Sequence, residues 1–562
     1  MSPILEFNSA PPSSSSKSRI RGPSTVPFAD PVRPKRCADS SKEARVVSKS
    51  EQDNMLVDTD EELEYDESDD EHDRMVVHVE VRQKQHSRLR EQPIMQIVIQ
   101  YIDEDLAKIE LGRELPGWTD VDILRDHVER VMVEEGAIGL ASVQVSEVDI
   151  HVHVYKTSLD NQVEEFSADL DDDNENEEKV SAASVRSLPS ADLDGIWDTL
   201  VYSDDIKARL LDYIYSTILF SECDIDFNVI AWNRVILLHG PPGTGKTSLC
   251  RALAQKISIR LSQKYRHGKI IEINSHSLFS KWFSESGKLV QKLFQMVTDM
   301  VEDESGFVVV MIDEVESLTA ARAGAMKGNE PSDSLRVVNA LLTQLDKLRT
   351  RKNVLVMTTS NLVDAIDEAF ISRVDLQEHI PLPPPRAVYS ILSGCLQECI
   401  TKGLIRHCRI LDWKAAEEAQ NERKWGRTDS IEGMKQGKRE RAVSGVLADL
   451  AVKCHSLELS GRTLRKLPVV SHARYLSRSS GEHRPLRVER WVEAMERVVD
   501  IEAQKKIESL KLIEGEVHDT MEKQLGVGGH RKTISKERHE LGTMVGTKMK
   551  GGGHGHNHHH GV

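Results

Sequence analysis

Cysteine is scarce in this chain, and the scarcity excludes one class of fold. Only seven cysteines occur among 562 residues, spread from Cys37 to Cys454. An odd and sparse set cannot supply the dense cross-links of a disulfide-stabilised protein, so we expect reduced thiols. Aromatic residues are also few, at 5%. We find no basic stripe interleaved with aromatics in the regions expected to be ordered, so we expect no direct nucleic-acid partner.

Long apolar runs and a leader segment are missing as well. No stretch approaches 18 consecutive apolar residues, so the sequence predicts no transmembrane helix and no membrane partner. The N-terminus lacks a basic segment followed by an apolar one, and we expect an intracellular protein. The run Arg33-Pro34-Lys35-Arg36 is either a nuclear import signal or a solvated basic patch.

Basic residues are absent from two acidic runs, and these runs account for the charge of the chain. The formal net charge is −17. Residues 58–73 contain eleven acidic residues and residues 164–178 contain nine, with no lysine or arginine in either run. The rest of the chain is therefore close to neutral, at about +3. We interpret the runs as exposed inserts that bracket a folded N-terminal domain.

The N-terminal third divides into three segments. Residues 1–74 are rich in serine, proline and acid, which predicts a disordered arm. Residues 75–160 predict a small α+β recruitment domain, with strand-like alternation at 76–81, 97–102 and 143–154 and helical spacing at 119–134. Residues 161–187 predict an acidic linker.

The remainder predicts a two-domain α/β and α architecture. Apolar runs of strand length at 235–239, 270–274, 308–312 and 354–358 alternate with helical stretches. This order is typical of a parallel sheet flanked by helices, here over residues 188–385. Residues 386–512 predict a small helical lid domain with a loop insertion at 421–441. Residues 513–562 predict a disordered Gly/His-rich tail.

A phosphate-binding loop follows the first of these strands. Residues 240–247 match the pattern GxxxxGK[ST] between an apolar strand and a helix at 248–258. Its glycines let backbone N–H groups face phosphate, Lys246 would reach the β- and γ-phosphates, and Thr247 would bind Mg²⁺. The alternative, a Gly/Pro-rich turn with a chance lysine, is disfavoured by this context. The predicted ATP-binding residues are Gly240, Pro241, Pro242, Gly243, Thr244, Gly245, Lys246 and Thr247.

Two carboxylates follow the strand at 307–312. Asp313 and Glu314 would lie at the carboxyl edge of the sheet, beside the phosphate loop. Asp313 would hold Mg²⁺, and Glu314 would polarise the attacking water, which predicts ATP hydrolysis rather than binding alone.

Two further polar residues are candidates for catalysis. Asn361 follows the strand at 354–359 and could position water against the γ-phosphate, or it could simply form a turn. Arg373 could contact the γ-phosphate of a neighbouring subunit, or it could form a surface salt bridge with Asp375.

At this point residues 195–467 resemble an AAA+ ATPase, and more narrowly the pachytene checkpoint protein 2 family, also known as the thyroid receptor interacting AAA+ ATPase. The resemblance depends on GIWDTLVY at 195–202, AWNR at 231–234, EINSHSLFSKWFSESGKL at 272–289, IDEVESLTAAR at 312–322 and SGRTLRKLP at 460–468. The N-terminal domain matches only weakly, chiefly at 77–81.

The resemblance implies a hexameric ring that remodels HORMA-domain proteins in meiotic chromosome-axis and spindle-checkpoint control. It implies a nuclear location, with some protein in the cytoplasm, and a possible HORMA-domain adaptor. Lys281, Trp282 and Phe283 would form a pore loop that grips the client, although core packing is the alternative for the two aromatics. Arg462 would be the sensor arginine of the lid, with Arg465 as the fallback.

The sequence differs from the usual AAA+ pattern at one point, and two other functions are alternatives. Residues 370–372 supply no second arginine before Arg373, which puts a two-arginine mechanism in doubt. The chain could be another AAA+ mechanoenzyme, of the severing or disassembly type. It could also be a nucleotide-switched scaffold, which Asp313, Glu314 and Arg373 disfavour.

Overall fold

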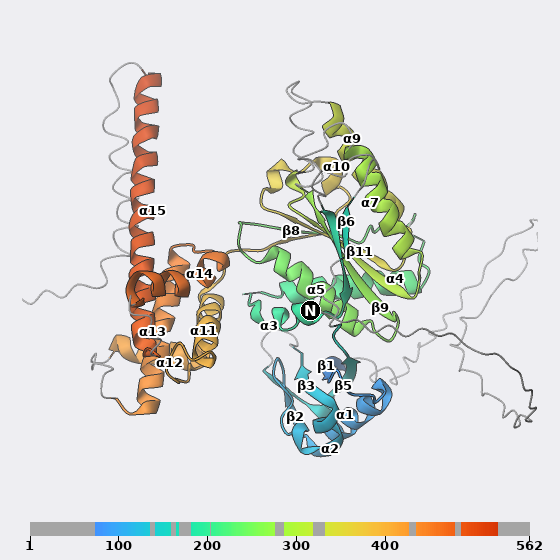
Figure 1. Cartoon of the computed structure of the whole chain (residues 1–562). Coiled ribbons are helices and arrows are strands. Elements are labelled where there is room, and N and C mark those ends of the chain that lie inside the picture. The colour runs from blue at the N-terminus through green and yellow to red at the C-terminus, as the bar shows by residue number, and fades with distance from the viewer. Residues whose placement is uncertain are drawn as a thin grey trace, which may run out of the picture. The chain divides into compact units, whose positions relative to one another are not determined.

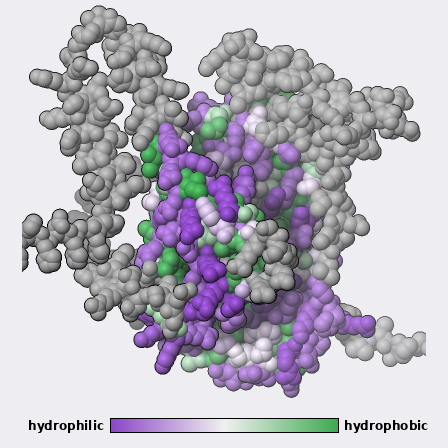
Figure 2. Space-filling model, turned by 60° about the vertical axis from the view of Figure 1, so that its left-hand side comes forward, coloured by the Kyte–Doolittle hydropathy of each residue, from purple (hydrophilic) through white to green (hydrophobic). Residues whose placement is uncertain are grey.

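The computed structural model describes residues 74–134, 141–158, 164–167, 181–202, 204–226, 228–275, 286–317, 332–425, 434–477 and 485–525. The predicted arm at 1–74, apart from Arg74, and the tail beyond residue 525 lie outside these residues. Among the described helices, none combines the length and apolar character needed to cross a membrane. The face shown in Figure 2 is mostly hydrophilic, with hydrophobic residues in small patches.

The N-terminal domain is a three-stranded sheet covered by a helix. Strand β1 (Met75–Gln83) lies between β3 (Val128–Val133), which is antiparallel to it, and β5 (Val148–Tyr155), which is parallel. Alternate β1 side chains pack against helix α1 (Glu91–Asp105) in one core. A short helix, α2 (Asp122–His127), and a small ladder of β2 (Lys108–Glu110) with β4 (Ser142–Gln144) complete it.

Two secondary-structure predictions for this domain were wrong. Residues 97–102 belong to α1, because Ile94, Val98 and Ile102 are spaced four apart and are all fully buried on one helix face. The helix predicted at 119–134 ends at His127, and the following residues form β3 because they pair with β1. Strand 143–154 is interrupted by a short 3-10 helix at Val145–Glu147.

The ATPase domain is built on a sheet that has seven strands in the described part of the chain (Figure 1). Neighbouring strands follow the order β12-β8-β11-β10-β9-β7-β6. The first five are mutually parallel, whereas β7 is antiparallel to β9 and β6 is antiparallel to β7. The strands are β6 (Glu164–Ser167), β7 (Ser181–Leu188), β8 (Val235–His239), β9 (His267–Asn274), β10 (Gly306–Asp313), β11 (Val354–Ser360) and β12 (Leu376–His379).

The sheet therefore differs from the prediction at both edges. Residues 161–187, predicted as a linker, contribute β6 and β7, so this sheet is mixed rather than purely parallel. Backbone pairing of β7 with β9, and of β6 with β7, places these strands even though the run is acidic. At the other edge, β12 has the sequence LQEH, which carries too few apolar residues for periodicity to reveal a strand.

Helices cover both faces of the ATPase sheet. Along β8, β10 and β11, alternate residues enter two separate cores, as the period of a strand requires. One core contains α7 (Ser286–Val301), α9 (Ser332–Leu348) and α10 (Glu368–Ile371). The other contains α3 (Ile196–Thr199), α4 (Ile206–Glu222) and α5 (Lys246–Arg260).

The C-terminal domain is helical, as predicted, with a core of its own. Its helices are α11 (Pro385–Thr401), α12 (Trp413–Trp425), α13 (Gln436–Ser456), α14 (Gly461–Ser471) and α15 (Val488–Leu525). Helices α12 and α13 extend into the predicted loop insertion at 421–441, of which residues 426–433 lie outside the described part. Helix α15 continues past residue 513, where the tail was predicted to begin.

Candidate nucleotide site

Three glycines shape the loop between β8 and α5. Gly240, Gly243 and Gly245 have φ angles of 139°, 78° and 99°, a region that favours glycine. A Cβ atom on Gly240 would lie 2.4 Å from the carbonyl oxygen of Ile380, so any side chain would collide there. The loop then leads into α5, whose first residue is Lys246. The amide-lined start of this helix is suited to an anion.

The Lys246 ammonium group is held by uncharged acceptors. Its Nζ donates to the carbonyl oxygens of Gly240 (2.8 Å) and Pro241 (2.9 Å) and to Oδ1 of Asn361 (2.8 Å). Burial lowers the pKa of Lys246, and the nearby carboxylates of Glu316 and Asp313 partly offset this effect. A buried cation with neutral acceptors is favourable for binding phosphate.

Thr247 and Asp313 meet at the end of β10, as the sequence predicts. The Thr247 hydroxyl lies 2.9 Å from Oδ1 and 3.2 Å from Oδ2 of Asp313. Asp313 also accepts from the Thr359 hydroxyl, and its carbonyl oxygen accepts from Ser275. A fixed carboxylate beside a hydroxyl is an oxygen-donor set that fits Mg²⁺.

The next residue, Glu314, lies on a sharp turn. Its φ of 56° is rare for a residue with a side chain, and its N–H donates to Oγ1 of Thr359 over 3.2 Å. Such a conformation costs about 1–2 kcal/mol and persists where surrounding contacts enforce it, often at functional sites. The turn places Glu314 directly after the buried strand, half-buried at the carboxyl edge.

Glu316 is a site residue that sequence reasoning missed. Its Oε1 accepts from the backbone N–H of Asn361 over 3.0 Å, and Glu316 is the carboxylate with the largest influence on the pKa of Lys246. The available signal was the run Asp313-Glu314-Val315-Glu316, which carries three carboxylates in four residues.

The lid domain reaches the same loop through the start of α14. A Cβ atom added to Gly243 would lie 2.8 Å from Oγ of Ser460 and 3.4 Å from Cβ of Arg462. An added Cβ on Gly461 would lie 3.2 Å from the carbonyl oxygen of Gly243. The structure thus brings Arg462 next to the phosphate loop. Arg465, the fallback, is instead an electrostatic neighbour of Cys395 on α11.

Arg373 is held at the edge of the domain by a partner that differs from the predicted one. Its Nε and Nη2 donate to the two carboxylate oxygens of Asp346 over 2.8 and 2.9 Å. The alternative salt bridge to Asp375 is wrong, because Asp375 accepts from Tyr213 (2.6 Å) and Asn233 (2.7 Å). The paired guanidinium lowers the pKa of Asp346.

Two sets of residues complete the comparison with the prediction. Leu200 and Tyr202 lie against the phosphate loop, with Leu200 Cδ2 3.4 Å and the Tyr202 hydroxyl 4.0 Å from a Cβ added to Gly245. Sequence reasoning assigned them no role at the site. Lys281, Trp282 and Phe283, predicted as a pore loop, lie outside the described residues.

The sheet order, the phosphate loop and the carboxylates after β10 define an AAA-class P-loop ATPase with a lid domain. A family model described as "ATPase family associated with various cellular activities (AAA)" matches residues 236–382. Two more models match its flanks, the "TRIP13 N-terminal domain" at 72–160 and the "TRIP13-like, AAA+ ATPase lid C-terminal domain" at 384–503.

The chain belongs to the pachytene checkpoint protein 2 family. It is 41% identical to the pachytene checkpoint protein 2 homolog of Rattus norvegicus over 76% of this chain and 94% of that protein. With the Homo sapiens homolog it shares 42% identity over 71% and 88% of the two chains. The structure of C. elegans PCH-2 covers 76% of this chain and 100% of that one, with 28% identity and a TM-score of 0.56. These similarities confirm the predicted family and fold class.

Proposed function

We propose that this protein is a hexameric AAA+ remodeller that hydrolyses ATP to unfold part of a HORMA-domain client. One observation supports the proposal most strongly. Lys246 and Thr247, Asp313, and Asn361 come from three separate places in the sequence and converge at one edge of the sheet. The lid helix α14 begins against the same loop, so a change in the bound nucleotide can be transmitted to the lid.

Within one chain, different residues have different roles in hydrolysis. Backbone N–H groups of the loop and Lys246 bind the phosphates, while Thr247 and Asp313 hold Mg²⁺, which supplies charge neutralisation when bound. Glu314 polarises the attacking water, and Asn361 orients it while holding Lys246 in place. Arg462 contacts the γ-phosphate from the lid.

Arg373 completes the site of a neighbouring subunit. Its bidentate pair with Asp346 fixes the guanidinium on the outside of its own domain, where an adjacent chain can approach it. An arginine supplied in trans stabilises charge that develops on the γ-phosphate in the transition state. This role requires a ring in which each site lies between two chains.

The client and the setting come from the family. We propose a HORMA-domain client, reached directly or through a HORMA-domain adaptor and gripped by Lys281, Trp282 and Phe283. The relatives carry the name pachytene checkpoint protein 2, in keeping with a role in meiotic chromosome-axis and spindle-checkpoint control. We accordingly propose a nuclear location, with some protein in the cytoplasm.

The variant Glu314→Gln tests the proposal. It keeps the shape of the side chain but removes the charge that polarises water, so ATP binding should persist while hydrolysis falls by about 100-fold or more. With ATP present, this variant should retain a HORMA-domain protein in pull-downs from meiotic cells. The double variant Lys246→Ala/Glu314→Gln, which cannot hold ATP, is the control and should retain none.

The two parts of the proposal fail separately. Unchanged ATP turnover in Glu314→Gln would contradict the role of that residue. Slow turnover without recovery of any HORMA-domain protein would contradict the client. Trp282→Ala should retain ATPase activity but lose client remodelling, and full remodelling by this variant would support core packing for Trp282 instead.

A further inference from the structure

The sheet of the N-terminal domain has a charged face that is nevertheless buried. Along β1, Val77, Val79 and Val81 enter the domain core, so His78, Glu80 and Arg82 project from the opposite face. This face lies against the ATPase domain. Glu80 and Glu134 are each about 5% exposed, which is unusual for carboxylates and requires partners.

The partners are two cations on helix α5. Nζ of Lys256 lies 2.8 Å from Oε2 of Glu80 and 2.7 Å from Oε1 of Glu134. Nε of Arg260 lies 3.5 Å from Glu80 Oε1, and its Nη2 lies 3.9 Å from Glu134 Oε2. We call Glu80, Glu134, Lys256 and Arg260 the junction cluster. All four side chains are only 5–6% exposed.

The junction cluster is balanced in charge but incompletely hydrogen-bonded. Oε1 of Glu80 and Nε of Arg260 are buried without a hydrogen-bond partner. Burial, together with repulsion from Glu134, raises the pKa of Glu80 to about 7. Burial alone would also raise the pKa of Glu134, but Lys256 and Arg260 outweigh it and lower that pKa. Because buried ion pairs gain little net stability, this one is well suited to a contact that can open.

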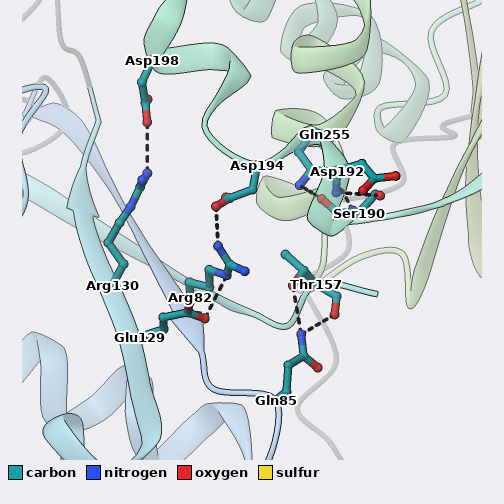
Figure 3. A network of polar contacts seen from close by, with 10 residues as sticks. All are labelled: Arg82, Gln85, Glu129, Arg130, Thr157, Ser190, Asp192, Asp194, Asp198 and Gln255. Carbon is teal, nitrogen blue, oxygen red and sulfur yellow. Dashed lines mark hydrogen bonds and ion pairs between the residues drawn. The ribbon is translucent and has the colours of Figure 1, made fainter. Parts of the chain in front are cut away.

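A second set of contacts ties the same sheet to the segment that follows β7 (Figure 3). Arg82 donates to Asp194 and lies 3.2 Å from Glu129, while Arg130 donates to Asp198 over 3.1 Å. Both aspartates flank Trp197, whose ring centroid is 5.4 Å from Nζ of Lys256. The two sets of contacts therefore form one continuous junction.

The N-terminal domain contacts helix α5 and the 194–202 segment, and both of these continue to the nucleotide site. Helix α5 begins at Lys246, and a mostly buried stretch of helix ten residues long, about 15 Å, leads from Lys246 to Lys256. The segment with Asp194 and Asp198 continues to Leu200 and Tyr202, which lie against Gly245 of the phosphate loop. A displacement of the N-terminal domain would thus act on both sides of the loop.

We infer that Glu80 and Glu134 are positioning residues for nucleotide binding, and that docking of the N-terminal domain through the junction cluster holds the phosphate-loop helix and the 194–202 segment in the arrangement that binds nucleotide. A partner that pulls the N-terminal domain off the ATPase domain lowers the nucleotide affinity of the same chain. By linkage, bound nucleotide strengthens the docking to the same extent. The inference requires nucleotide binding but neither the proposed client nor hydrolysis.

The test is the affinity of the full chain for a fluorescent ADP analogue. Glu134→Gln leaves two buried cations, Lys256 and Arg260, with Glu80 as their one remaining carboxylate in the junction cluster, and we expect the analogue to bind at least about fivefold more weakly. Glu134→Asp should recover part of the loss. The matched control is Glu110→Gln in the same domain, where Glu110 pairs with Arg113 on the surface, and its affinity should stay within about twofold of the unchanged chain.

A milder variant covers the case in which Glu134→Gln does not fold. Arg82→Gln/Arg130→Gln removes partly exposed pairs at the edge of the junction and should also weaken binding, whereas Arg113→Gln should not. If this double variant loosens the junction, as seen by faster hydrogen exchange in β1, yet binds the analogue as tightly as the unchanged chain, the inference is overturned.

A double-mutant cycle and the reverse experiment complete the test. If Glu134 and Lys256 act as a unit, Glu134→Gln/Lys256→Met should bind the analogue no more weakly than the weaker single variant. Fully additive losses would show independent effects and contradict the inference. Saturating ADP should slow hydrogen exchange of β1 and β3 amides in the unchanged chain, and exchange that ignores ADP would also overturn it.

Discussion

At the scale of single residues, the charges of the nucleotide site are arranged to favour binding of an anion. Lys246 is buried and donates hydrogen bonds to two carbonyl oxygens and an amide oxygen. The nearby carboxylates have other hydrogen-bond partners. Asp313 accepts from Thr247 and Thr359, and Glu316 accepts from the backbone N–H of Asn361. The positive charge of Lys246 therefore remains available for phosphate.

This arrangement predicts that Asn361→Asp weakens nucleotide binding. The substitution keeps the shape but puts a negative charge 2.8 Å from the Lys246 ammonium, which neutralises it and repels phosphate. We expect at least about a tenfold loss of affinity for an ADP analogue. Asn361→Ala, which adds no charge, should change the affinity by less than about threefold.

The matched control is Asn339→Asp, which adds the same charge at an exposed position of α9. It should leave the affinity unchanged. Tight binding by Asn361→Asp would mean that Lys246 does not contact the nucleotide as the geometry suggests.

At the scale of secondary-structure elements, the polar face of the N-terminal sheet predicts a pH dependence. Burial and the nearby Arg260 lower the pKa of His78 to about 3 and that of His153 to about 4. Each histidine therefore contributes stability above its unfolded pKa of about 6.5, and that stability is lost as the pH falls toward these values. Glu80 acts oppositely, because its raised pKa of about 7 favours folding as the pH falls from 7 to about 4.5.

The two histidines take up protons on unfolding, whereas Glu80 releases one. Between pH 6.5 and 4.5 the unfolded chain therefore binds about one proton more than the folded domain, and the free energy of unfolding of the N-terminal domain should fall as the pH falls. The slope would be about 1.4 kcal/mol per pH unit at most. Hydrogen exchange of β1 and β5 amides, corrected for the intrinsic effect of pH, measures it. The variant His78→Asn/His153→Gln should reverse the sign of this slope, because only the opposite contribution of Glu80 remains, and an equal slope in both proteins would refute the assignment. The groups around the pair are Glu80, Glu134, His151, Tyr215, Lys256 and Arg260.

Strands buried on both faces were the easiest elements to predict. β8, β10 and β11 are nearly continuous apolar runs, and site residues lie at or directly after the end of each: Gly240 after β8, Asp313 at the end of β10 and Asn361 after β11. Thr359 and Ser275 were not predicted because their roles depend on register. Ile312 pairs with Thr358, and Asp313 pairs with Asn274, so Thr359 and Ser275 come to lie beside Asp313. A single sequence does not reveal which residues of separate strands are paired.

Elements stabilised by tertiary contacts were harder to predict. β6 and β7 lie within and beside an acidic run, and their place depends on backbone pairing of β7 with β9 and of β6 with β7. The junction cluster was missed for a related reason. Glu80 and Lys256 are 176 residues apart, and each looks like an ordinary surface charge until the two domains bury them together.

At the scale of the whole molecule, the net charge of −17 comes from the two acidic runs rather than from the rest of the chain. Glu164 and Glu165 of the second acidic run belong to β6, so this run begins on the ATPase sheet itself. The remainder is close to neutral and pairs its charges internally, at the junction cluster and between Arg373 and Asp346. Neutralising residues 164–178 by Glu→Gln and Asp→Asn changes should therefore affect long-range attraction between the proposed ring and its partners more than ATP turnover.

The proposed ring predicts that two inactive variants restore each other. Arg373→Ala chains keep Glu314 but cannot complete a neighbour's site, and Glu314→Gln chains keep Arg373 but cannot polarise water. In a mixed ring, a site with Glu314 from one chain and Arg373 from the next is intact. Random equal mixing should give about a quarter of wild-type ATPase activity. Steady-state turnover of co-refolded or co-expressed chains measures this, with each variant alone as the control. If the mixture stays as inactive as its components, Arg373 acts within its own chain, where Asp346 already holds it.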